Sequence, residues 1–123
     1  MLIRLWKVEM SDCLFCKIVS GEIPCDKIYE NDKLIAFRDI DPKAPTHILV
    51  IPKKHISSIN ELEISDQNLA GEILLAAKEI ARIENIESSG YRTIFNTNND
   101  GGQTVYHIHM HVMGGRQLHW PPG

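Results

Sequence analysis

Apolar and β-branched residues gather in five short segments of the chain, and these segments predict strands. An Asn31-Asp32 turn separates the first two segments, which indicates an antiparallel hairpin. The third segment holds the apolar run Ile48-Leu49-Val50-Ile51, which predicts a strand. The predicted strands are residues 27–30, 34–39, 46–52, 91–96 and 105–113.

A helical period replaces this pattern after Ser65, where apolar residues recur at spacings of three and four. We therefore predict one long amphipathic helix, with Ser65 as its N-cap and its end before residues 88–90. A short helix over residues 13–20 is predicted between Asp12, as N-cap, and Gly21. The order of elements favours an α+β fold, an antiparallel sheet with its helices packed on one side.

The last predicted strand carries three of the six histidines of the chain, His107, His109 and His111, in alternation with apolar residues. Because successive side chains of a strand point to opposite faces, the three imidazoles share one face and the apolar residues pack on the other. Neighbouring histidines then stand about 6 to 7 Å apart, close enough to surround one small group. A metal site is the alternative, since imidazoles at i and i+2 can chelate zinc.

A glycine-rich loop, NDGGQT at residues 99–104, directly precedes the histidines. By itself it is a hairpin loop. Beside three histidines it favours a phosphate, because a glycine such as Gly102 lets backbone N–H groups approach phosphate oxygens closely. The Gln103 amide and the Thr104 hydroxyl can donate further hydrogen bonds to those oxygens.

Length and charge limit the classes of function. The 123 residues fit one domain, and the net charge of −3 argues against binding to a nucleic-acid backbone. No apolar run approaches the roughly 20 residues of a membrane span, and three cysteines without an export signal do not indicate a disulfide framework. We expect a cytoplasmic protein with a loosely attached tail, residues 1–10, before a single domain, residues 11–123.

The segment NNDGGQTVYHIHMHVMGGRQLHWPPG, residues 98–123, resembles the C-terminal half of the histidine triad (HIT) family. Its WPPG ending is similar to the Hint branch, the histidine triad nucleotide-binding proteins. CLFCKIVSGEIP, AFRDIDPKAPTHILVIPKKHI and GYRTIFN extend the resemblance upstream, so that it covers residues 12–123. The resemblance implies a five-stranded antiparallel sheet with one short and one long helix, and sheets joined across a homodimer.

The resemblance also implies roles for the histidines. His109 is expected to attack the α-phosphorus of a purine nucleotide and to form a nucleotidyl-imidazole that water hydrolyses. An imidazole with a pKa of about 6.5 is largely neutral and nucleophilic near neutral pH. His111 is expected to bind the phosphate and His107 to orient its neighbours, with His47 beside the leaving group.

Further positions match nucleotide-binding residues of the family. Asn96 is expected to contact the phosphate or leaving group, and Asp39 both ribose hydroxyls. Five apolar residues are candidates for the base pocket, with core packing as the competing explanation for each: Phe15, Ile18, Ile23, Phe37 and Ile40.

Cys13 and Cys16 form a CxxC pair, which needs two further ligands to complete a tetrahedral zinc site. In zinc-bearing relatives of the family, His47 and His107 can supply them. A redox pair or a buried pair is the alternative. No cofactor is required for the expected reaction, so any zinc is expected to be structural.

The resemblance implies a hydrolase that cleaves the P–N bond of adenosine or guanosine 5′-phosphoramidates, with acyl adenylates as related substrates. Its ligand is then a purine nucleoside monophosphate or a phosphoramidate of it. Three alternatives remain. They are a dinucleoside polyphosphate hydrolase, which the WPPG ending disfavours, a nucleotide-binding scaffold, and a metallohydrolase that uses the three imidazoles as ligands.

Overall fold

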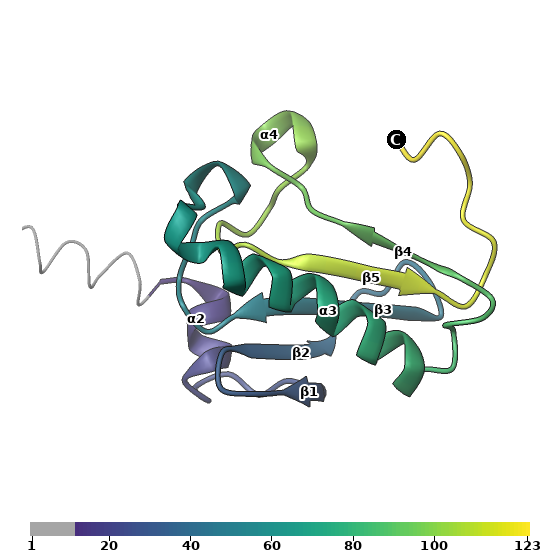
Figure 1. The fold of residues 1–123 in the computed structure, drawn as a ribbon, viewed down its shortest axis with the longest axis horizontal. Helices are drawn as coiled ribbons and strands as arrows, with labels where there is room; N and C mark the ends of the chain where they lie inside the picture. The colour runs from purple at the N-terminus through teal and green to yellow at the C-terminus, as the bar shows by residue number, and fades with distance from the viewer. Residues whose placement is uncertain (1–11) are drawn as a thin grey trace, which may run out of the picture.

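The computed structural model describes residues 12–123, and the predicted tail of residues 1–10 lies outside them. In the described residues, five strands form one antiparallel sheet in the order β1-β2-β3-β5-β4 (Figure 1). This confirms the predicted sheet. Its strands are β1 (Lys27–Glu30), β2 (Leu34–Arg38), β3 (Thr46–Pro52), β4 (Tyr91–Ile94) and β5 (Met110–Gly114).

The two main helices, α2 (Leu14–Val19) and α3 (Gln67–Ile83), cover opposite faces of the sheet. Helix α3 packs on even-numbered side chains of β2, β3 and β5, whereas α2 packs on odd-numbered side chains of β2 and β3. The expectation that the helices lie on one side was therefore wrong. The central strands β2 and β3 are apolar on both faces, and each face requires a cover.

The helices begin one or two residues later than predicted, and α3 ends at Ile83, about five residues before the predicted end at residues 88–90. Cys13, rather than Asp12, caps α2, since its Sγ accepts from the Cys16 backbone N–H at 3.4 Å. Helix α3 begins at Gln67 because the residues before it, Ile64–Asp66, form a separate 3₁₀ turn. Another 3₁₀ turn covers Ile59–Glu61. No helix in residues 12–123 is both long and apolar enough to cross a membrane.

The last strand begins at Met110, five residues later than predicted, and β4 ends at Ile94 rather than at residue 96. The Ile108 N–H donates to the Ile56 carbonyl at 2.6 Å, so the chain before β5 pairs with the segment after β3 instead of with the sheet. The glycine-rich loop contains a short helix, α4 (Asn98–Gly101), which ends at Gly102 with a φ of 83°. These departures place the first two histidines of the row, His107 and His109, before the strand, so that only His111 lies within β5.

The Glu84 carboxylate at the end of α3 joins the end of β2, through an ion pair, to the start of β3, through a hydrogen bond. Arg38 donates two hydrogen bonds to the Glu84 carboxylate, at 2.7 and 2.9 Å, and the Thr46 hydroxyl donates to the same carboxylate at 3.5 Å. Because Thr46 directly precedes His47, these contacts fix the backbone from which the His47 side chain projects.

Candidate active site

His47, on β3, and two histidines of the C-terminal row lie on the same face of the sheet as α2. The His47 Nε2 atom lies 2.9 Å from the His111 Nδ1 atom, and the rings of His109 and His111 are 5.0 Å apart between centroids. Phe15 of α2 contacts the His109 ring edge-on at 5.1 Å. The register of β3 and β5, which pairs His47 with Met113 and Leu49 with His111, produces this grouping.

The His109 ring is held in one tautomer. Its Nδ1 atom lies 2.8 Å from the carbonyl oxygen of His107, and a carbonyl can only accept, so Nδ1 carries the hydrogen. Burial lowers the pKa of His109, and the ring is therefore neutral near pH 7. A neutral ring with its hydrogen on Nδ1 has a free electron pair on Nε2, which is the atom that a nucleophile needs.

One ring nitrogen of His111 has no protein partner. This atom, Nε2, is enclosed and forms no hydrogen bond with any atom of residues 12–123. Burial, followed by the neighbouring His109 and His47, lowers the pKa of His111 to about 4. An enclosed polar atom without a protein partner on a neutral ring is suited to contact a ligand.

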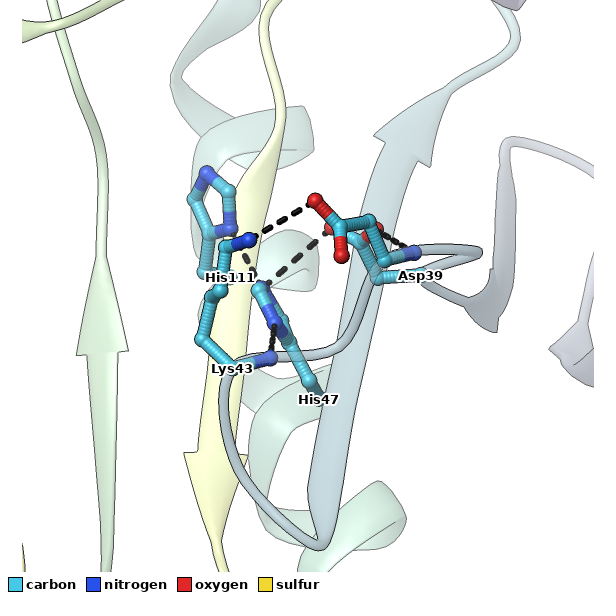
Figure 2. Close-up of polar contacts among 5 residues, drawn as sticks. Asp39, Lys43, His47 and His111 are labelled. Atoms are coloured by element: carbon cyan, nitrogen blue, oxygen red, sulfur yellow. Dashed lines mark hydrogen bonds and ion pairs between the residues drawn. The ribbon is translucent and has the colours of Figure 1, made fainter.

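Figure 2 shows how His47 is held. Its Nδ1 atom accepts the Lys43 backbone N–H at 3.0 Å, and its Nε2 atom lies 3.5 Å from the Asp39 carboxylate. The other Asp39 oxygen accepts the Asp41 backbone N–H at 2.8 Å. Burial lowers the pKa of His47 in spite of the nearby carboxylates, which act in the opposite direction.

A second cluster joins Cys13, Cys16, His55 and His107. The His107 Nδ1 atom lies 3.4 Å from Cys13 Sγ, 3.6 Å from Cys16 Sγ and 3.2 Å from His55 Nδ1, and Cys16 Sγ lies 3.3 Å from His55 Nδ1. Ligand atoms around a tetrahedral zinc are separated by about 3.4 to 3.8 Å, given Zn–N and Zn–S bonds of about 2.1 and 2.3 Å. The four donor atoms therefore already have nearly the spacing of a zinc site.

The orientation of the His107 ring also fits a cation between the four donor atoms. The His107 Nε2 atom lies 2.8 Å from the Pro52 carbonyl, to which it donates, so the electron pair of Nδ1 faces the two sulfurs. Burial and the adjacent Cys13 raise the pKa of the Cys16 thiol to about 12. A thiolate is stable here only if a positive charge compensates it.

The expected ligand set was wrong in one residue, because His55 occupies the place predicted for His47. The segment after β3 turns back across the end of the sheet and brings His55 to His107, while His47 stays with Asp39 and His111. The three histidines of the row also do not share one metal, because His107 faces the cysteines and His109 Nδ1 faces a carbonyl. This arrangement disfavours the metallohydrolase alternative.

Gln103 departs from its expected role. Its side-chain nitrogen donates to the carbonyls of Ser57, at 2.7 Å, and Val105, at 3.1 Å, while its oxygen accepts the Asn98 N–H at 2.9 Å. Both amide hydrogens are thus used inside the protein, and the expected bond from this amide to a phosphate was wrong. Gln103 instead joins the glycine-rich loop to the segment that carries His55.

The structure brings together some of the other predicted residues. Phe15 and Ile18 of α2 pack with Phe37 of β2 in the core on this face of the sheet, and half-buried Ile23 packs against them. The rings of Phe15 and Phe37 meet edge-on, with 5.7 Å between their centroids. Ile40, in contrast, is fully exposed. Gly102 and Thr104 are exposed on the glycine-rich loop, and Asn96 is half-buried at its start.

An antiparallel sheet with a histidine cluster on one face and a Cys/His cluster beside it defines an α+β domain with a histidine-rich candidate site. Comparison with known proteins identifies the family. The model of the HIT domain matches residues 20–118, so the chain belongs to the HIT family.

Individual relatives agree with this assignment to the HIT family. An uncharacterised HIT-like protein of Synechococcus elongatus is 53% identical over 112 residues, covering 91% of this chain and 97% of the relative. The purine nucleoside phosphoramidase of Escherichia coli is 49% identical over 107 residues, covering 87% and 90%. The crystal structure of a HIT family hydrolase from Legionella pneumophila superposes with a TM-score of 0.89 at 54% identity, covering 91% of this chain and all of that one.

Proposed function

We propose that this protein is a purine nucleoside phosphoramidase, a hydrolase of adenosine and guanosine 5′-phosphoramidates that releases the nucleoside monophosphate and an amine. The observation that carries the proposal is the protonation of His109, whose Nδ1–H bond to the His107 carbonyl leaves Nε2 free to attack. The 49% identity to the E. coli phosphoramidase supports the choice of substrate.

The reaction has two steps. His109 Nε2 attacks the phosphorus, the P–N bond to the amine breaks, and the departing nitrogen takes a proton from water. A second water then attacks the nucleotidyl-imidazole, loses a proton, and releases the monophosphate together with the restored His109. Asp39 binds the ribose hydroxyls, Asn96 with the Gly102 backbone and the Thr104 hydroxyl contacts the phosphate, and His111 faces it with Nε2.

Substrate preference tests the proposal. We expect kcat/KM for adenosine 5′-phosphoramidate to exceed that for diadenosine polyphosphates at least tenfold, because the proposed site holds one nucleoside monophosphate and acts on its α-phosphorus. Initial rates with both substrates, and with an acyl adenylate, give the ratio. A higher kcat/KM for the diadenosine compound would make the protein a polyphosphate hydrolase instead.

We also propose that Cys13, Cys16, His55 and His107 hold a structural zinc ion. The spacing of the donor atoms and the orientation of the His107 ring support it. A zinc ion there would supply no chemistry to the reaction. It would hold His107, whose carbonyl in turn orients the His109 ring.

We propose further that two copies of the chain join at β4. The strand order leaves β4 at one edge of the sheet, with no strand outside it among the described residues, and an open edge exposes unpaired backbone groups. Light scattering is expected to give about twice the 14.0 kDa mass of the chain. A mass of one chain at micromolar concentration would contradict the homodimer. The cytoplasmic location stays a prediction.

A further inference from the structure

The site contains two neighbouring rings, His109 and His111, whose Nδ1 atoms have opposite kinds of partner. His109 Nδ1 faces a carbonyl oxygen, whereas His111 Nδ1 faces the Nε2 atom of His47. In a neutral imidazole one nitrogen carries the hydrogen and the other accepts, so the partner of one nitrogen determines the state of the other. The state of His111 therefore depends on His47.

The state of His47 is fixed by the backbone. Its Nδ1 atom accepts the N–H of Lys43 at 3.0 Å, and a backbone N–H can only donate (Figure 2). His47 Nδ1 must then be bare, and its hydrogen is on Nε2. That hydrogen points to His111 Nδ1, at 2.9 Å, in preference to the Asp39 carboxylate at 3.5 Å.

The reverse arrangement, with a hydrogen on His111 Nδ1 that His47 accepts, would move the His47 hydrogen to Nδ1. Two hydrogens would then face each other between His47 Nδ1 and the Lys43 nitrogen, which are 3.0 Å apart. The observed geometry excludes this arrangement for a neutral His47 ring.

We propose that His47 is a positioning residue. The Lys43 backbone N–H keeps the hydrogen of His47 on Nε2, and this hydrogen is donated to His111 Nδ1. His111 therefore carries its own hydrogen on Nε2 and donates it to the phosphoryl group. This inference rests on the proposed function for the identity of the acceptor. It explains why the enclosed Nε2 atom of His111 has no partner among the described residues.

One consequence is that two chemically identical side chains have different roles in the reaction. The carbonyl beneath His109 makes its Nε2 an electron-pair donor for attack on phosphorus, and the His47 ring beside His111 makes the corresponding atom a hydrogen donor for the phosphoryl oxygens. Both rings do this while neutral, so the site needs no imidazolium to bind the phosphoryl group.

The direct test is NMR of ¹⁵N-labelled protein without substrate, with long-range ¹⁵N–¹H correlations that show which nitrogen of each ring carries hydrogen. We expect Nε2–H for His47 and His111 and Nδ1–H for His109. In His47→Ala, His111 is expected to lose its fixed form and to give averaged nitrogen shifts. A wild-type His111 with hydrogen on Nδ1, or an unchanged His111 in His47→Ala, would overturn the proposal.

Matched variants separate positioning from folding. A glutamine amide reaches about as far as Nε2 of histidine and can donate to His111 Nδ1, whereas asparagine reaches only to Nδ1. We therefore expect His47→Gln to retain the His111 form and His47→Asn to lose it. Lys43→Pro removes the backbone donor and is expected to disturb His47, while Lys43→Ala keeps the N–H and the wild-type pattern. Identical patterns in His47→Gln and His47→Asn would contradict the assignment.

Kinetics supply the functional readout. With adenosine 5′-phosphoramidate, His47→Ala is expected to lower kcat about 10- to 100-fold with little change in KM, and His47→Gln to recover most of the loss. Because the NMR result is obtained without substrate, it stands even if the phosphoramidate is not hydrolysed, which would instead refute the proposed function. If the His47→Ala variant kept both the wild-type tautomer of His111 and the wild-type kcat, the positioning role would be refuted.

Discussion

Replacing His109 with alanine is expected to lower kcat/KM for adenosine 5′-phosphoramidate by at least about four orders of magnitude. The loss is large because no other described side chain can take over the attack. His111 Nδ1 is occupied by His47, and both nitrogens of His107 are directed to Pro52 and to the cysteine cluster. Removal of His109 therefore removes the bond-forming atom rather than one of several contributors.

The covalent intermediate can be measured directly. Wild-type reactions quenched within one turnover are expected to show, by mass spectrometry of peptides, a nucleotide attached at residue 109, and the alanine variant none. Lys78→Ala is a suitable control, because Lys78 is exposed on α3, which covers the opposite face of the sheet. If the alanine variant formed product at the wild-type rate, a nucleophilic role for His109 would be excluded.

Local sequence patterns predicted the elements well where one physical requirement dominates. Strand β3 has the predicted bounds, because seven consecutive residues are buried between the two helices and apolar residues fill nearly all of them. The long helix follows from its period of three and four, although it begins at Gln67 and ends at Ile83, about five residues before the predicted end. The same apolar run also indicated that a helix packs on each face of the sheet, but the run was interpreted only as a strand.

The site was predicted less completely, because its chemistry depends on contacts between distant segments. Gln103 occupies the sequence position of a phosphate ligand, yet its amide is used by Ser57, 46 residues away. His55 was missed as a partner of the CxxC pair because its nearness to His107 arises from the turn after β3. A histidine three residues beyond a buried strand that ends at Pro52 was the available signal.

The protonation of the rings could not be predicted from residue types at all. His109 and His111 have the same side chain and follow the same alternation, but different atoms lie against their Nδ1 atoms. One partner is a backbone carbonyl and the other is a ring oriented by a backbone N–H, so backbone geometry assigns the two roles.

Protein purified without chelator is expected to contain about one zinc ion per chain, and Cys16→Ser to contain almost none. Removing one of four ligands leaves a site that binds zinc too weakly to retain it through purification. If free zinc exceeds the dissociation constant about a thousandfold, the bound ion stabilises the fold by about 4 kcal/mol, and this is the free energy that the variant loses. Elemental analysis and chemical unfolding, with and without chelator, measure both effects.

Cys25→Ser is the matched control, because Cys25 is a free, half-buried thiol outside the cluster, and its replacement is expected to leave the zinc content unchanged. The loss of zinc is also expected to lower kcat. Without the metal, His107 keeps its bond to Pro52 and its contacts with the thiols and His55 but loses the ligand bond that would fix Nδ1, so we expect the carbonyl that orients His109 to be less fixed and kcat to fall while the wild-type tautomer of His111 persists. Wild-type protein with no bound metal and an unfolding curve that chelator does not shift would show instead that the two thiols and two imidazoles pack without an ion.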